Sequence, residues 1–192
     1  YKRQAKCSKV LMSPYGRVMR YVGIAEAGRG QLAGPGVAAA VVLPPALAIA
    51  ELHDSKQLTD RQRDRVYSRL LRQGVTYGID MVSHAEIDRQ DILWASKEAM
   101  CRAVRHLGDT LGSDGPDLLL IDGNATIPSP IPQRTLVRGD ARCTSIAAAS
   151  VMAKVTRDRL MAAYARRYPA YGFERHKGYP TRAHYAQLQA HG

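Results

Sequence analysis

Short apolar runs recur along the chain, and each is bounded by glycine, proline or charged residues. Runs of this length, rich in branched apolar side chains, are typical of β-strands. The first two, YVGI and VAAAVVL, are joined by the glycine-rich stretch GRGQLAGPG at residues 28–36. The pattern predicts five strands, over residues 21–24, 37–43, 75–82, 117–121 and 134–137.

Helical periodicity and capping residues fill the segments between these strands. Thr59 can cap a helix that ends before Gly74. Ser83 and Glu86 form a capping box for a short turn, and residues 91–107 carry apolar positions at helical spacing. Near the C-terminus we expect a long helix from about Thr144 to Arg167, a loop over residues 172–181 and a last helix from about Arg182. Strands that alternate with helices predict an α/β fold with one mixed sheet packed by helices.

Charge identifies the expected partner. The chain of 192 residues has a formal net charge of +11, and 21 of its 28 basic residues are arginine, the side chain best shaped to bind phosphate. Residues 1–20 form a basic arm without an acidic residue, and residues 21–192 are long enough for one domain. We therefore expect a nucleic-acid partner.

Membrane and disulfide classes are disfavoured. The longest apolar run is short and broken by Pro44 and Pro45, so no membrane-spanning helix is expected. Three cysteines without CxxC spacing (Cys7, Cys101 and Cys143) indicate neither a disulfide framework nor a zinc site. A reducing, cytoplasmic location fits this pattern.

Three carboxylates stand at or near the ends of predicted strands: Glu26 after the first, Asp122 after DLLLI, and Asp140 after RTLVRG. Any one of them alone is more often a turn former or a helix cap. If the strands are neighbours, the three converge, and a carboxylate set without histidine or cysteine suits Mg²⁺ or Mn²⁺. A pair of such ions, roughly 3.5–4 Å apart, can bind the attacking and leaving oxygens of a phosphodiester. Such a site normally needs a carboxylate that bridges the two metals, and three carboxylates are few for this purpose.

The glycine-rich turn fits no nucleotide-cofactor motif. It lacks the Lys-Ser/Thr of a P-loop, and its glycine spacing misses the dinucleotide fingerprint by one residue. Its glycines allow a sugar-phosphate chain to approach the backbone closely, and Arg29 adds positive charge. A tight strand connection without any ligand is an equally good interpretation.

Several ordered motifs resemble type 2 ribonuclease H, the ribonuclease HII family. They are GIAEAGRGQLAGP, DSKQLT, EIDRQDILWASKEAM, LLLIDGN, RGDARCTSIAAASVMAKVTRD and YGFERHKGYPT, and together they extend from about residue 21 to the end. The resemblance implies a ribonuclease H-like mixed sheet with a C-terminal helical region. It also implies a cytoplasmic monomer that uses Mg²⁺ or Mn²⁺ to cut the RNA of RNA–DNA hybrids. Nicking of duplex DNA on the 5′ side of single ribonucleotides, as in ribonucleotide excision repair, is implied as well.

The resemblance makes Glu26, Asp122 and Asp140 metal ligands and reveals one departure. The family has an aspartate before the glutamate, whereas this chain has Ala25. A missing ligand should cost more than the roughly 10–100-fold typical of an outer-shell partner, so we predict little or no cleavage. An alanine engineered to trap intact substrate is the preferred explanation, and a natural silent paralogue is the alternative.

The same resemblance assigns substrate contacts. It places Gly28, Arg29 and Gly30 at the ribose 2′-hydroxyl and the neighbouring phosphate, and Tyr179 against the sugar or base beside the junction. Lys56 in DSK can pair with a phosphate, although a surface lysine usually has no specific role. Without the resemblance, Tyr179 would be read as a half-buried loop aromatic. Two other functions stay open: a non-cleaving binder of hybrid or ribonucleotide-containing duplex, and a ribonuclease H-like nuclease that acts on DNA.

Overall fold

A mixed five-stranded sheet forms the centre of the molecule. The computed structural model describes all of the chain except residues 1–17, 45–46, 48, 50, 53–57 and 114. Most of the basic arm, including Cys7, therefore lies outside the described residues, and so does Lys56. The strands are β1 (Tyr21–Ala27), β2 (Gly36–Val42), β3 (Thr76–Val82), β4 (Leu118–Asp122) and β5 (Gln133–Leu136). Their order is β3-β2-β1-β4-β5; β1 pairs with β2 antiparallel and with β4 parallel. The predicted α/β fold is confirmed.

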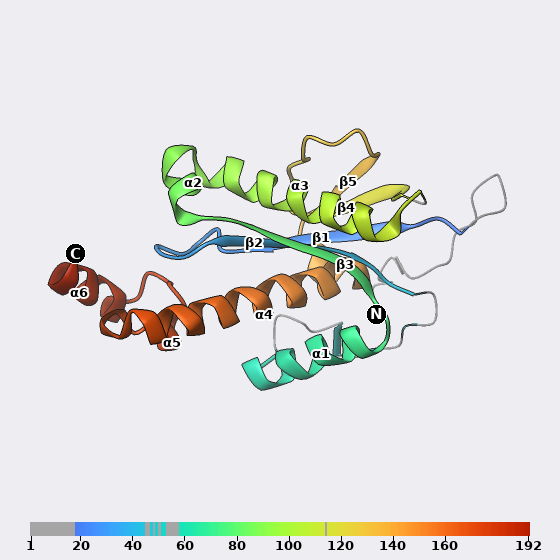
Figure 1. Cartoon of the computed structure of the whole chain (residues 1–192). Helices are drawn as coiled ribbons and strands as arrows, with labels where there is room; N and C mark the ends of the chain where they lie inside the picture. Colours follow the sequence, from blue (N-terminus) through green and yellow to red (C-terminus); the bar gives the residue numbers. More distant parts are fainter. Residues whose placement is uncertain (1–17, 45–46, 48, 50, 53–57, 114) are drawn as a thin grey trace.

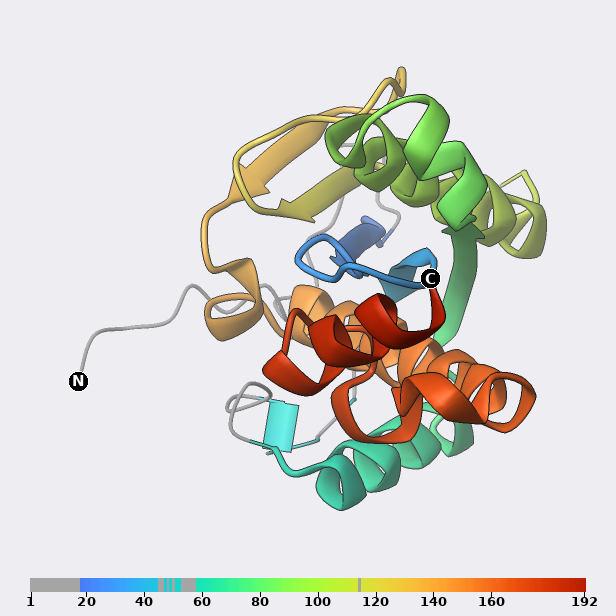
Figure 2. The same cartoon turned by 90° about the vertical axis from the view of Figure 1, so that its left-hand side faces the viewer.

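Helices cover both faces of this sheet (Figure 1). The helices are α1 (Asp60–Arg72), α2 (His84–Arg89), α3 (Ile92–Leu111), α4 (Thr144–Arg167), α5 (Phe173–His176) and α6 (Arg182–His191). α3 packs on one face and α4 on the other, with α1 beside α4. Figure 2 shows α5 and α6 beside the loop that joins β1 and β2. Within the described residues, no helix is long and apolar enough to cross a membrane.

Alternation along β1 supplies side chains to both cores. Val22 and Ile24 belong to the apolar cluster that includes α3 residues, whereas Ala25 belongs to the cluster that includes α4 residues. Gly23 makes the closest approach, because a Cβ there would lie 2.1 Å from the carbonyl carbon of Ser145 in α4. Small side chains in β1 and β2 and the alanines of α4 therefore allow this helix to pack directly on the sheet.

Two predictions about the helices were wrong. The α3 helix continues past residue 107 to Leu111, where Gly112 follows with a φ of 63°. The predicted 172–181 loop contains the short helix α5, which starts after Gly172. At the first place, the prediction ends the helix at Gly108, but the helix continues through it. At the second, the prediction treats the glycine-flanked segment as a loop, although it contains one short helix.

The α2–α3 corner carries an acid-sensitive contact. Glu86 completes the predicted capping box with Ser83, and its other carboxylate oxygen accepts a hydrogen bond from Nη2 of Arg102 at 2.7 Å. The Arg102 hydrogen bond, followed by those from Ser83, lowers the pKa of Glu86 from 4.5 to about 2. Because the folded pKa is depressed, the stabilisation is fully present above pH 4.5 and is lost as the pH falls through about 2.

We expect Glu86→Gln to lower the free energy of unfolding at pH 7, and the deficit relative to the unsubstituted chain to shrink between pH 4.5 and pH 2. Urea unfolding of both proteins across this range measures the difference. A deficit that is constant with pH would show that the Glu86 charge does not contribute.

Candidate active site

The three predicted carboxylates lie at the carboxyl ends of neighbouring parallel strands. Glu26 lies inside β1, which runs three residues further than predicted, because residues 25–27 pair with Val37–Ala39 of β2. Asp122 is the last residue of β4, which pairs with β1. Asp140 sits in a 3₁₀ turn (Gly139–Ala141) that follows β5. The topology thus brings all three to one edge of the sheet, as expected if the strands are neighbours.

Electrostatics and hydrogen bonds link these carboxylates in pairs. Burial raises the pKa of Glu26; the Arg29 charge opposes this rise and the nearby Asp122 charge adds to it. Oδ1 of Asp122 accepts a hydrogen bond from the backbone N–H of Gly139 at 2.8 Å, next to the buried Asp140. Within the described part of the chain, however, no three histidine, cysteine, aspartate or glutamate side chains are grouped closely enough to hold a metal ion.

Two cavities meet at Glu26. The larger, of about 380 Å³, lies on the α4 side, and the smaller, of about 140 Å³, lies on the α3 side. Asp140 lines the larger one and Asp122 the smaller one, whereas Glu26 lines both. The described lining residues include no histidine or cysteine, so the donor set fits a hard cation such as Mg²⁺ or Mn²⁺.

Ala25 precedes Glu26 in β1 and is buried. Its side chain is 1% exposed and faces the α4 side of the sheet, opposite to the preceding Ile24. A carboxylate at this position would extend toward the side that carries Asp140.

The Gly-Arg-Gly turn borders the larger cavity. Gly28 has a φ of 130°, and a Cβ there would lie 2.8 Å from the Pro35 carbonyl oxygen, so the fold requires glycine. Gly30 differs, because its φ is not positive and a Cβ would meet nothing within 4 Å. The fold therefore gives no reason for glycine at position 30.

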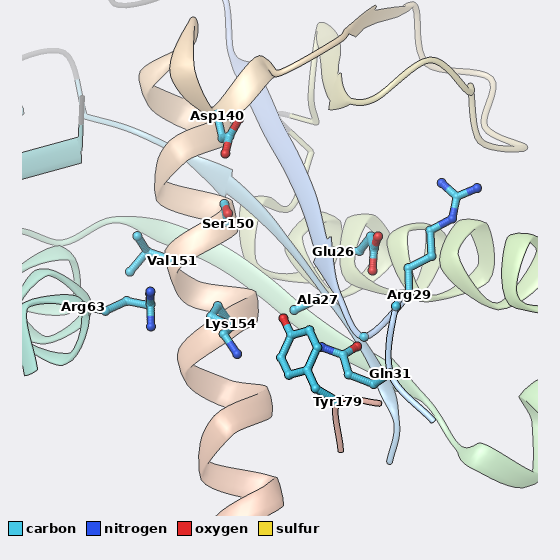
Figure 3. A pocket seen from close by; sticks show the side chains of 12 residues that line it. Glu26, Ala27, Arg29, Gln31, Arg63, Asp140, Ser150, Val151, Lys154 and Tyr179 are labelled. Carbon is cyan, nitrogen blue, oxygen red and sulfur yellow. The ribbon is translucent and has the colours of Figure 1, made fainter. Parts of the chain in front are cut away.

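Further side chains complete the wall of the larger cavity (Figure 3). Tyr179 is 43% exposed, and its ring centroid lies 5.4 Å from Nζ of Lys154 in α4. Ser150 and Lys154 project from α4, and Arg63 projects from α1. The sequence alone did not identify Arg63, Ser150 or Lys154 as residues of the site. Their helical spacing gives no functional signal until α1 and α4 are placed beside the turn.

Histidine 176 belongs to the packing of the C-terminal helices. Its ring stacks on that of His184, with the ring centroids 4.3 Å apart, and its Nε2 lies 2.8 Å from the Tyr171 carbonyl oxygen, within hydrogen-bond distance. It lines neither cavity described above. These buried contacts do not favour a proton-transfer or phosphate-binding role for His176.

Comparison with known proteins fits this geometry. The Ribonuclease HII family model matches residues 22–192. A ribonuclease HII of Syntrophotalea carbinolica is 49% identical over 88% of this chain and 78% of its own length, and one of Bacillus cereus is 46% identical over 94% and 70%.

Solved structures agree on the fold. Ribonuclease H2 of Pyrococcus horikoshii aligns with a TM-score of 0.72 at 26% identity, over 88% of this chain and 85% of that one. Ribonuclease HII of Archaeoglobus fulgidus, solved in complex with PCNA, aligns with a TM-score of 0.70 at 21% identity over 90% and 87%. This chain belongs to the ribonuclease HII family, whose members are hydrolases that cleave the RNA of RNA–DNA hybrids.

Proposed function

We propose that this chain recognises RNA–DNA hybrids and single ribonucleotides embedded in duplex DNA, and that its scaffold is that of an endonuclease cutting on the 5′ side of the ribonucleotide. One observation carries the proposal. The Gly-Arg-Gly turn, Tyr179 and two of the three carboxylates, Glu26 and Asp140, line the same cavity. A group that can read a 2′-hydroxyl thus lies beside groups that can support phosphodiester hydrolysis.

Each part of the site has a distinct task. Backbone atoms of Gly28–Gly30 contact the 2′-hydroxyl, Tyr179 stacks on the sugar or base, and Arg29 and Lys56 bind phosphates. Glu26, Asp122 and Asp140 would hold Mg²⁺ or Mn²⁺, which supplies water activation and charge neutralisation in a two-metal hydrolysis. In the reaction, water attacks phosphorus in line and leaves a 3′-hydroxyl and a 5′-phosphate.

Ala25 limits the chemistry but leaves binding intact. Its buried methyl group provides no ligand, whereas the residues that contact nucleic acid are all present. The chain as written therefore binds substrate and cleaves it poorly, which also supports the alternative of a non-cleaving binder. We further propose that it acts as a cytoplasmic monomer in ribonucleotide excision.

Binding tests this proposal without requiring cleavage. Fluorescence anisotropy compares three duplexes of one sequence: all-DNA, DNA with one ribonucleotide, and RNA–DNA hybrid, at a fixed salt concentration because phosphate contacts make affinity salt-dependent. We expect both ribonucleotide-containing duplexes to bind more tightly than all-DNA. Equal affinity for all three would contradict the proposal.

Gly30→Ala probes the turn directly. We expect the substitution to weaken binding of the single-ribonucleotide duplex about 5- to 10-fold, which corresponds to the loss of roughly one hydrogen bond. The stability of the protein should not fall, because the added methyl group meets no protein atom within 4 Å. Gly108→Ala is the matched control, since that glycine also faces open space and lies in α3 away from the turn. Unchanged affinity in Gly30→Ala would remove the turn from the interface.

A further inference from the structure

A buried arginine ties together the two loops that border the larger cavity. Arg157 lies in α4 and is 0% exposed. Its Nε donates to the Pro35 carbonyl oxygen at 3.0 Å, and its Nη2 donates to that of Ala33 at 2.8 Å. Its Nη1 donates to the Lys177 carbonyl oxygen at 2.8 Å. One guanidinium thus contacts both the glycine-rich loop 28–36 and the Tyr179 loop at residues 177–179.

These loops also contact each other directly. The backbone N–H of Leu32 donates to the Gly178 carbonyl oxygen at 2.9 Å. A Cβ on Gly178 would lie 2.3 Å from the Ala33 carbonyl oxygen, so the contact needs glycine there. The Arg157 guanidinium also lies close to the Gly-Arg-Gly turn: a Cβ on Gly28 would be 3.2 Å from its Nε. Any shift of one loop against the other would therefore strain several short contacts.

An arginine at this position is costly for stability but effective for geometry. Removing a guanidinium from water carries a desolvation penalty, which an apolar side chain of similar volume would avoid. The planar guanidinium directs several N–H donors at fixed angles, whereas a lysine ammonium is a compact charge on a flexible stem. The benefit of Arg157 is thus a fixed separation between the two loops.

We propose that Arg157 is a positioning residue for ribonucleotide selection, because it holds the 2′-hydroxyl-reading turn and Tyr179 at the spacing that one ribonucleotide requires. This inference rests on the proposed function. It predicts that loosening Arg157 reduces discrimination between ribonucleotide and deoxyribonucleotide, whereas general phosphate binding, which needs no such spacing, changes little.

The test measures the ratio of dissociation constants for all-DNA and single-ribonucleotide duplexes. Arg157→Lys keeps the charge and loses the three-way contact. Arg159→Lys is the matched control on the same helix, because Arg159 has a 56% exposed side chain that pairs with Asp64. We expect Arg157→Lys to reduce the preference for the ribonucleotide about tenfold and to change all-DNA affinity less than twofold. Arg159→Lys should leave the preference unchanged.

A second variant approaches the same contact from the other loop. Leu32→Pro removes the N–H that donates to Gly178, and the Leu32 side chain is exposed. Leu32→Pro should also reduce the preference for the single-ribonucleotide duplex over all-DNA. If Arg157→Lys does not fold, Leu32→Pro alone tests the inference. A preference that survives both substitutions overturns the inference alone. A lack of preference in the unsubstituted chain overturns the proposed function, and the role of Arg157 in selection falls with it.

Discussion

Ala25→Asp is expected to raise the rate of nicking at a single embedded ribonucleotide by more than about 100-fold in the presence of Mn²⁺. Loss of an outer-shell partner typically costs roughly 10–100-fold in metal affinity or activity, and loss of a direct ligand should cost more. The position faces the α4 side of the sheet, as Asp140 does, and its neighbour Glu26 borders both cavities. A carboxylate at position 25 would lie between Glu26, which borders both cavities, and Asp140, which borders only the larger one.

Ala25→Asn is the control for this prediction, because it has the size of aspartate without its charge. Since Ala25 is buried, the aspartate should destabilise the metal-free protein, and Mn²⁺ should raise its melting temperature by binding only the folded state. The asparagine variant should show neither the gain in rate nor this rise. If the two variants nick at the same rate while both are folded, position 25 is not a metal ligand.

Gly23→Ala is expected to lower the free energy of unfolding by about 3 kcal/mol, at the upper end of typical overpacking costs. The added methyl group would meet the Ser145 backbone at 2.1–2.3 Å, and both partners belong to a strand and a helix that cannot easily separate. Because β1 carries Glu26 and α4 carries Lys154, the same shift should disturb the larger cavity.

Urea unfolding measures this cost, with Gly36→Ala as the control. Gly36 also lies in a strand, but a Cβ there would meet nothing within 4 Å. Its substitution should not lower the free energy of unfolding, because the added methyl group meets no protein atom. A small effect at Gly23 would mean that α4 can move away from the sheet at low cost.

The sequence predicted which segments form strands and helices better than it predicted where they end. Apolar runs and capping residues depend on local patterns, and the caps at Thr59 and Ser83 form as expected. The end of β1 depends on pairing with β2, where Glu26 lies opposite Ala38. That pairing is a long-range property, and an alanine–glutamate–alanine segment gives little local indication of a strand.

The site divides in the same way. Carboxylates at strand ends could be found from the sequence, because strand ends at one edge of a parallel pair must meet. Lys154 and Arg63 could not, because their helices reach the cavity only after the chain folds. Arg157 could not either, since its partners are backbone carbonyl groups up to 124 positions away in the sequence, and no residue type marks such partners.

The most direct measurement maps the cut made by Ala25→Asp with Mn²⁺ on an end-labelled duplex that holds one ribonucleotide, beside an all-DNA duplex of the same sequence. We expect one nick, on the 5′ side of the ribonucleotide, with a 3′-hydroxyl and a 5′-phosphate at the break and no nick in the all-DNA duplex. Comparable cutting of the all-DNA duplex would contradict it. So would tight binding of the ribonucleotide duplex without any cut, which would favour a pure binder.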